Sequence, residues 1–330
     1  MQSVISKRFR GWQPLASITA LIATLAIPMT ARAQLWHVQV GAQSQDKGGQ
    51  VLAFLPNEIW IHAGDTITWT LASDEPHTVA LLAPGQVRPP FAVGCPGTTP
   101  DGSDENGSNC VNSGLLAGGQ SYSVTFPKTG NYKLVCLIHA NMTAVVHVLD
   151  TSQELPHNQN FYDVQAADEQ NELLSAVGQT KDRDENHARH GVVAGTGEIV
   201  ATAGGSETLS VLRFMQPTKV VHVGETVEWT NSDPVTAHTI TFGTEPANPI
   251  PPSANVTMDA DGARHATVSS PADNVHSGFI SAAPQDEIGL PQPPLSFTRF
   301  RVTFTRPGLF NYKCALHDGL GMVGQVIVLP

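Results

Sequence analysis

The chain has 330 residues, a length that suggests two domains. It carries 18 Lys and Arg against 29 Asp and Glu, and this net charge of −11 argues against a nucleic-acid partner, since such proteins present a basic face. Hydrophobic residues make up 41% of the chain, enough for packed cores, and charged residues only 14%. With 29 Gly and 24 Pro, the composition indicates many short strands joined by turns rather than long charged helices.

Residues 1–33 have the layout of a secretory signal peptide. A basic segment with Lys7, Arg8 and Arg10 precedes an apolar stretch over residues 15–27, and residues 31–33 fit a small-x-small cleavage site. A membrane anchor is the alternative interpretation, but the stretch is short for a span of about 20 residues. No other segment is apolar enough to cross a bilayer. We therefore expect export to the periplasm or the extracellular space, and no stable membrane span after cleavage.

Export makes disulfides possible for the four cysteines. Cys95 and Cys110 bracket a loop of Gly, Asp, Asn and Ser, and we expect a disulfide between them. Such a bridge closes about 15 residues and contributes about 3 kcal/mol in the chain-entropy model. Two free thiols are the alternative. A bond between Cys136 and Cys314 is possible on the cysteine count alone, but the residues around them argue otherwise.

The same unit occurs twice in the chain. Residues 62–70 are echoed by residues 222–230 at an offset of 160, and the offset grows to 161 at His77 and His238 and to 178 at Cys136 and Cys314. A growing offset means insertions between fixed points, and insertions settle in surface loops. Because this period far exceeds that of a solenoid, the pattern indicates duplication of a whole domain.

Each copy has the pattern of an all-β domain. Apolar and β-branched residues alternate at period two around residues 59–70 and 221–229, with Gly-acid turns between the strands. Short strands at this spacing predict a sandwich of about 100 residues. We place the first domain at residues 34–150 and the second at 196–330. The linker, residues 151–195, is predicted to contain one helix over 161–177, with Gly178 as its C-cap.

Cysteine, histidine and methionine recur at matching places in the two copies. The first copy holds His77 and then Cys136-x-x-His139-x-x-Met142. The second holds His238 and then Cys314-x-x-His317-x-x-x-x-Met322. Two imidazoles, one thiolate and a weak axial thioether are the ligands of a blue copper centre, whereas zinc prefers four strong ligands. Ordinary buried core residues are the alternative, but both copies keeping all four residue types by chance is improbable.

At these residues the chain resembles the cupredoxin family of plastocyanin, amicyanin and pseudoazurin. The resemblance covers residues 35–150 and 196–330, and the shorter ligand loop looks like that of amicyanin, the longer one like that of plastocyanin or pseudoazurin. It implies an all-β fold of two tandem Greek-key sandwiches, each with one type 1 copper at one end. The implied function is electron transfer by Cu(I)/Cu(II) cycling.

Two other functions stay open. The first is copper storage, delivery or sensing without a redox partner. The second, less favoured, is a two-domain copper oxidase or nitrite reductase. Family members of that kind have a histidine beside the blue-site cysteine, but Val135 and Leu137 flank Cys136, and Lys313 and Ala315 flank Cys314. We therefore expect a carrier rather than an enzyme.

The expected partner is a redox protein, such as a cytochrome, that donates or accepts electrons. Removal of residues 1–33 takes away four basic residues and leaves 14 basic against 29 acidic, a charge of −15. This charge predicts long-range attraction to a cationic partner. The alternative is that the charge only keeps the exported protein soluble. Small and apolar residues around His139 and His317 predict an uncharged docking patch in which each of these histidines is exposed. His62 and His222, which share a repeat position, are interpreted as polar residues on a strand rather than as ligands.

Overall fold

The computed structural model describes residues 32–88, 95, 97–187, 191–282 and 297–330. The predicted signal peptide lies almost wholly outside the described residues. Among the helices of the described part, none is long and apolar enough to cross a membrane.

The first copy folds into two sheets. One sheet has the order β2-β1-β4-β8-β6, with β1 parallel to β4 and antiparallel to β2. In the other sheet β10 pairs with β3 in parallel and with β9 antiparallel, and β9 continues to β5 and β7. The strands are β1 Leu35–Gln43, β2 Gly49–Leu55, β3 Glu58–His62, β4 Thr66–Leu71, β5 Ala80–Leu81, β6 Ser103–Asp104, β7 Val111–Asn112, β8 Ser121–Thr125, β9 Gly130–Val135 and β10 Thr143–Leu149.

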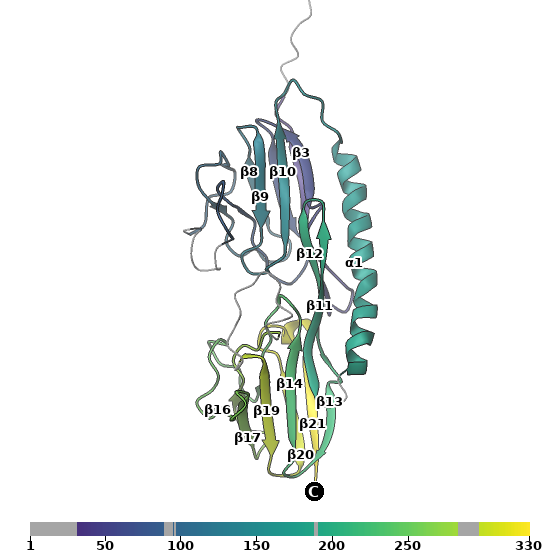
Figure 1. The fold of residues 1–330 in the computed structure, drawn as a ribbon, viewed down its shortest axis with the longest axis vertical. Helices are drawn as coiled ribbons and strands as arrows, with labels where there is room; N and C mark the ends of the chain where they lie inside the picture. Colours follow the sequence, from purple (N-terminus) through teal and green to yellow (C-terminus); the bar gives the residue numbers. More distant parts are fainter. Residues whose placement is uncertain (1–31, 89–94, 96, 188–190, 283–296) are drawn as a thin grey trace, which may run out of the picture. The chain divides into compact units, whose positions relative to one another are not determined.

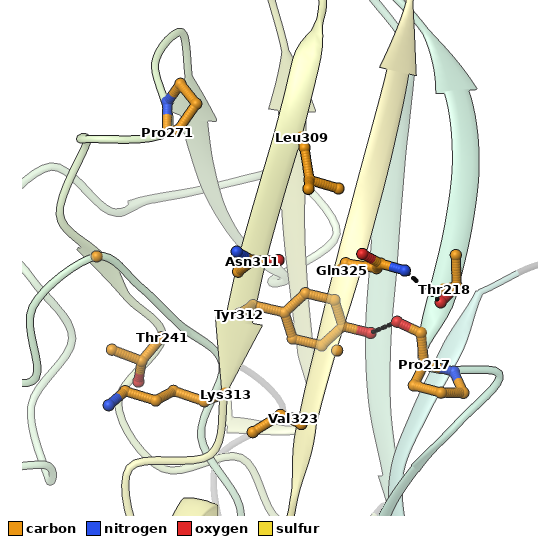
Figure 2. Close-up of a pocket in the computed structure, with 12 residues that line it drawn as sticks. Pro217, Thr218, Thr241, Pro271, Leu309, Asn311, Tyr312, Lys313, Val323 and Gln325 are labelled. Atoms are coloured by element: carbon orange, nitrogen blue, oxygen red, sulfur yellow. Dashed lines mark hydrogen bonds between the residues drawn. The ribbon is translucent and has the colours of Figure 1, made fainter.

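The second copy repeats this plan. Its sheets have the orders β12-β11-β14-β19-β17-β16 and β13-β21-β20-β15-β18. Figure 2 shows β20 and β21, where the Tyr312 hydroxyl donates to the Pro217 carbonyl at 2.9 Å. The elements are β11 Val192–Thr202, β12 Gly205–Met215, β13 Thr218–His222, β14 Thr226–Ser232, β15 Thr241–Phe242, β16 Thr257–Met258, β17 Arg264–Val268, β18 Val275–His276, β19 Arg299–Phe304, β20 Gly308–Lys313, the 3₁₀ turn Asp318–Leu320 and β21 Val323–Leu329.

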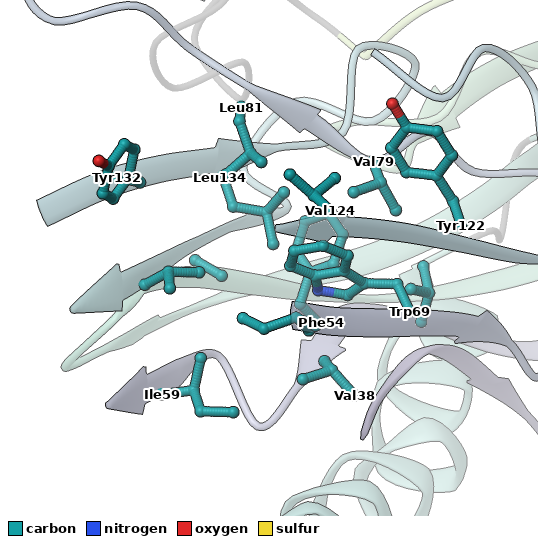
Figure 3. Packing of buried hydrophobic residues seen from close by; sticks show 14 of the residues in the cluster. Val38, Phe54, Ile59, Trp69, Val79, Leu81, Tyr122, Val124, Tyr132 and Leu134 are labelled. Carbon is teal, nitrogen blue, oxygen red and sulfur yellow. The ribbon is translucent and has the colours of Figure 1, made fainter. Parts of the chain in front are cut away.

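Alternating side chains of the two sheets form the core of each copy. In the first copy Trp69 of β4 and Val124 of β8 pack with Ile59 of β3 and Leu134 of β9, all fully or almost fully buried (Figure 3). Trp229, Phe300 and Phe304 belong to the corresponding cluster of the second copy. Period-two patterning places one face of each strand in this core, and the prediction of two all-β sandwiches is confirmed.

The two copies are joined by backbone pairing as well as by the linker. Strand β2 of the first copy pairs antiparallel with β12 of the second, with Leu52 opposite Thr208. Thr143 of β10 also pairs with Ser206. The helix α1, Gln159–His187, packs on β1 and β2 of the first copy and on β11 and β12 of the second (Figure 1). These contacts fix the two copies against each other. The predicted start of the second domain at residue 196 lies inside β11.

The linker helix is longer than the sequence pattern predicts. Asn158 caps its start by accepting the Phe161 N–H at 3.1 Å. The prediction that Gly178 ends the helix is wrong, because the helix continues to His187. A glycine inside a helix costs about 1 kcal/mol. Val177 offsets this cost by packing against the buried Val193 and Met215 of the second copy, so tertiary contacts override the local signal.

Candidate metal centres

The first cluster gathers His77, Cys136 and His139. His77 lies in the loop after β4 and is held by backbone bonds with Leu116, while Cys136 directly follows β9. The Cys136 Sγ lies 4.0 Å from His77 Nδ1 and 3.8 Å from His139 Nδ1, and the two Nδ1 atoms are 3.1 Å apart. All three side chains are buried.

The second cluster has the same construction. Cys314 Sγ lies 3.9 Å from His238 Nδ1 and 3.4 Å from His317 Nδ1, and the two nitrogens are 3.2 Å apart. Within the described residues, these two are the groups of three or more His, Cys, Asp or Glu ligand atoms that lie within 4.8 Å of one another. The structure therefore brings together six of the eight residues predicted from the sequence in two matching triads.

The donor atoms fit a metal ion at the centre of each triad. With bonds of about 2.0–2.1 Å to imidazole nitrogen and about 2.3 Å to thiolate sulfur, a trigonal ion holds its N and S ligands about 3.8 Å apart. The observed N–S distances of 3.4–4.0 Å bracket this value. Each histidine offers Nδ1, so the ring edge that carries Nε2 points away from the triad.

The predicted axial residues Met142 and Met322 are fully buried and belong to the same core clusters as Cys136 and Cys314. The Cys136 N–H donates to the Met142 carbonyl at 2.9 Å, and the Cys314 N–H to the Met322 carbonyl at 3.1 Å. Each of these hydrogen bonds joins the cysteine at the start of a ligand loop to the methionine at its end. The second loop is longer and holds the 3₁₀ turn Asp318–Leu320.

Charge within the triads favours a thiolate. Burial opposes ionisation of the Cys136 thiol, but the facing His139 and His77 hold its pKa well below its usual range. The pKa of the Cys314 thiol is also lowered by its two histidines, against the effect of burial. Burial lowers the pKa of His77, which keeps that imidazole neutral. Thiolate and neutral imidazole are the forms that bind a metal, so a metal ion would have to displace the proton of His139, whose pKa is raised to about 10 in the metal-free chain.

Threonines next to the ligand histidines support both sulfurs. The backbone N–H of Thr78 lies 3.5 Å from Cys136 Sγ, and that of Thr239 lies 3.4 Å from Cys314 Sγ. Each threonine hydroxyl also accepts the N–H of the residue after the cysteine, at 2.7 Å in both copies. Hydrogen bonding around such a sulfur tunes the redox potential of a copper bound to it.

Two glycines leave room for the first histidine of each triad. Gly41 interrupts the β1 ladder at φ +67°, and Gly195 interrupts the β11 ladder at φ +76°. A Cβ atom on Gly41 would lie 2.8 Å from His77 Nε2, and one on Gly195 would lie 2.5 Å from His238 Cδ2. The repeat pattern does not reveal this pair of glycines. Their offset of 154 departs from the 160 that relates the nearby segments.

A carboxylate lies between the two triads. Glu75 Oε1 is 3.1 Å from His139 Nε2, and Glu75 Oε2 is 3.7 Å from His317 Nε2. Burial opposes its ionisation, but the two histidines hold the pKa of Glu75 below its usual range. Against the effect of burial, Cys136 and Glu75 raise the pKa of His139 to about 10 in the metal-free chain. The sequence signal was an acid two residues before His77 with no acid at the matching place in the second copy.

The prediction that His139 and His317 are exposed is wrong. Their exposed fractions are 2% and 3%. Both line one mostly apolar cavity of about 360 Å³, to which the first copy contributes Leu115 and Ile138 and the second Phe279 and Leu316, among other residues. The docking patches predicted around His139 and His317 therefore form one shared cavity, because the β2–β12 pairing and α1 hold the copies together.

The remaining candidates lie away from the triads. Cys95 and Cys110 form a disulfide, and Cys136 and Cys314 are free and buried. His62 Nε2 lies 2.8 Å from the Gln153 carbonyl. His222 is exposed beside Glu225. His62 and His222, which share a repeat position, are therefore both outside the two triads. A cavity of about 580 Å³ beside Tyr312 contains none of the triad residues (Figure 2).

Comparison with known proteins gives a family match. The chain matches the family described as copper binding proteins, plastocyanin/azurin family, over residues 39–149 and 199–329. It therefore belongs to the plastocyanin/azurin family of copper-binding proteins. Similar solved structures include a reduced amicyanin variant, 21% identical over 35% of this chain and 82% of that chain, with a TM-score of 0.24. Amicyanin from Paracoccus versutus is 23% identical over 37% and 86% of the two chains, with the same TM-score. In a copper-binding family, the two His–Cys–His triads fit two copper ions.

Proposed function

We propose that the chain is an exported electron carrier with two type 1 copper centres, one in each copy. The duplicated buried triad supports this proposal most directly. His77, Cys136, His139 and Met142 would hold the first copper, and His238, Cys314, His317 and Met322 would hold the second. Copper bound there supplies one-electron exchange between Cu(I) and Cu(II).

The chain itself prepares these sites for fast exchange. Each triad is set by backbone bonds on both sides, from the Leu116 and Ile280 bridges to the cysteine-to-methionine loop closures. Buried donors that are already close together need little movement when the charge of the bound ion changes. The Thr78 and Thr239 donors hold each sulfur in one orientation. Exposed fractions of 0–3% for the triad residues keep water away from the sites.

Copper storage or delivery fits these sites less well. A protein that releases its metal benefits from ligands that a recipient can reach. Here the thiolates are completely buried, and the imidazoles almost completely. A carrier needs only an electron path to the surface, and the shared cavity with its exposed Leu115 and Leu316 supplies an apolar place where a redox protein, such as a cytochrome, docks.

We propose a carrier rather than an oxidase or reductase. The triads found in the described residues are both His–Cys–His, and no histidine directly precedes or follows either cysteine in the sequence. A redox titration of the copper-loaded chain from Gln34 onward tests the proposal. Reversible bleaching and return of an intense Cu(II)–thiolate absorption supports a carrier. Copper that leaves the chain on reduction supports storage or delivery, and turnover of nitrite or of oxygen with a phenol above a free-copper control supports an enzyme.

A further inference from the structure

Glu75 contacts the outer edges of one histidine from each triad. His139 and His317 both direct Nδ1 toward their own cysteine and Nε2 toward this one carboxylate, at 3.1 and 3.7 Å. Each carboxylate oxygen faces a different histidine. One connection from one triad to the other therefore runs through an imidazole, the carboxylate and a second imidazole.

The surroundings strengthen these contacts. Glu75 is 6% exposed, and its cavity is lined mainly by apolar residues of both copies. Hydrogen bonds and ion pairs are stronger where water is excluded. Strand pairing between β2 and β12 holds the copies in register, so the spacing of the two histidines does not depend on a flexible linker.

The repeat shows that this carboxylate is a single, shared feature. At the matching position the second copy has Thr236, which lines the same cavity. Thr236 Oγ1 lies 3.3 Å from Ser210 Oγ, within its own copy. The second triad has a buried carboxylate of its own, Asp233, 3.9 Å from His238 Nε2, but Glu75 is the one that lies near a histidine of each triad in the described residues.

We propose that Glu75 bridges the two metal sites and makes them a coupled pair that exchanges an electron inside the chain, an inference that rests on the proposed carrier function. In the copper-loaded chain, one centre would lose one electron and the other would gain it. No bond forms or breaks, and no proton has to move, because one carboxylate oxygen lies within hydrogen-bond distance of His139 Nε2 and the other within ion-pair distance of His317 Nε2. A partner that docks at the shared cavity then reaches both centres through one contact.

The test compares E75Q with T236V, which changes the matching position in the same cavity. Glutamine keeps the size of the side chain but removes the charge and replaces one acceptor oxygen with a donor group, so it cannot present an acceptor oxygen to both histidines. In metal-free protein, we expect nitrogen-15 NMR to show slowly exchanging Nε2 protons for His139 and His317. E75Q should lose at least one of these signals, and T236V should keep both.

Midpoint potentials are then measured in C314S and C136S backgrounds, each of which isolates one centre. A negative charge beside a ligand favours the more positive oxidised state, so E75Q should raise the midpoints of both centres. E75D keeps the charge, and its midpoints should lie closer to wild type. After a one-electron pulse, the concentration-independent redistribution between the centres should be slower in E75Q than in T236V.

A shift confined to the Cys136 centre would overturn the bridge, as would equal redistribution rates in the two variants. Binding of a third copper that E75Q abolishes would also overturn it, since Glu75 would then be a ligand. Failure of the carrier function is distinguishable, because wild-type protein would then lack the Cu(II)–thiolate absorption before any substitution at Glu75.

Discussion

Alanine at Gly195 should disable the second metal centre and leave the first intact. Gly195 lies in the β11 bulge at φ +76°, directly against the His238 ring. An added Cβ would lie 2.5 Å from His238 Cδ2 and 2.9 Å from Cε1. Carbon atoms normally approach to about 3.5–4.0 Å, so the ring has to retreat by about 1 Å.

The free-energy cost of G195A has two parts, one from the backbone conformation and one from packing. A left-handed backbone costs a non-glycine residue about 1–2 kcal/mol. Overpacking a filled site adds about 1–3 kcal/mol. His238 is completely buried, so its ring has no open space to enter. Metal sites tolerate ligand displacements of about 0.2 Å, which a shift of about 1 Å far exceeds.

Gly224 supplies the matched control. It has φ +91°, and nothing lies within 4 Å of an added Cβ. G224A should therefore lower the free energy of unfolding by about 1–2 kcal/mol and bind two coppers. G195A should lower it by about 2–5 kcal/mol and bind one copper with the spectrum of the Cys136 centre. Denaturant unfolding measures the free energy of unfolding, copper analysis counts the bound ions, and absorption spectra show which centre remains. The reasoning fails if G195A retains both centres with wild-type spectra.

Other predictions follow from the ligand loops and from one buried acid. C136S should remove one copper absorption and retain the Cys314 band; loss of all colour, or of none, would contradict separate sites. Because the His-to-Met gap is longer in the second loop, the two centres should differ in spectrum and midpoint, and identical titrations of the single-site variants would refute this. Burial and the nearby Glu169 and Glu172 raise the pKa of Glu207, 3% exposed on β12, to about 7. Its stability contribution is therefore present below pH 4.5 and lost as the pH rises through about 7. E207Q should be more stable than wild type at pH 8 by up to about 3 kcal/mol and no more stable at pH 4, and an equal difference at both pH values would contradict the assignment.

The two His–Cys–His clusters could be predicted because the duplication makes their pattern visible. A lone Cys-x-x-His pattern is weak, but the same residue types recur at fixed points in both copies. Strand periodicity likewise predicted the sandwiches, since alternating residues such as Ile59 and Trp69 need only their local neighbours to be recognised. The cysteine and histidine spacing and the strand alternation both lie within short segments of the chain, so they can be recognised from the sequence alone.

What the sequence did not predict depends on contacts between distant segments. Glu75 and His317 are 242 positions apart, and they meet because the β2–β12 pairing and α1 hold the two copies together. That same pairing buries His139 and His317, which were expected to be exposed. Gly178 is a local stop signal, and the packing of Val177 on the second copy overrides it.

The central claim is that each copy binds one copper through its cysteine thiolate. The most direct test is the absorption spectrum and the metal content of the copper-loaded chain from Gln34 onward. We expect two copper ions per chain and an intense visible absorption that disappears entirely only when Cys136 and Cys314 are both replaced by serine. A chain that binds one copper or none, or that binds two without a Cu(II)–thiolate absorption, would contradict it.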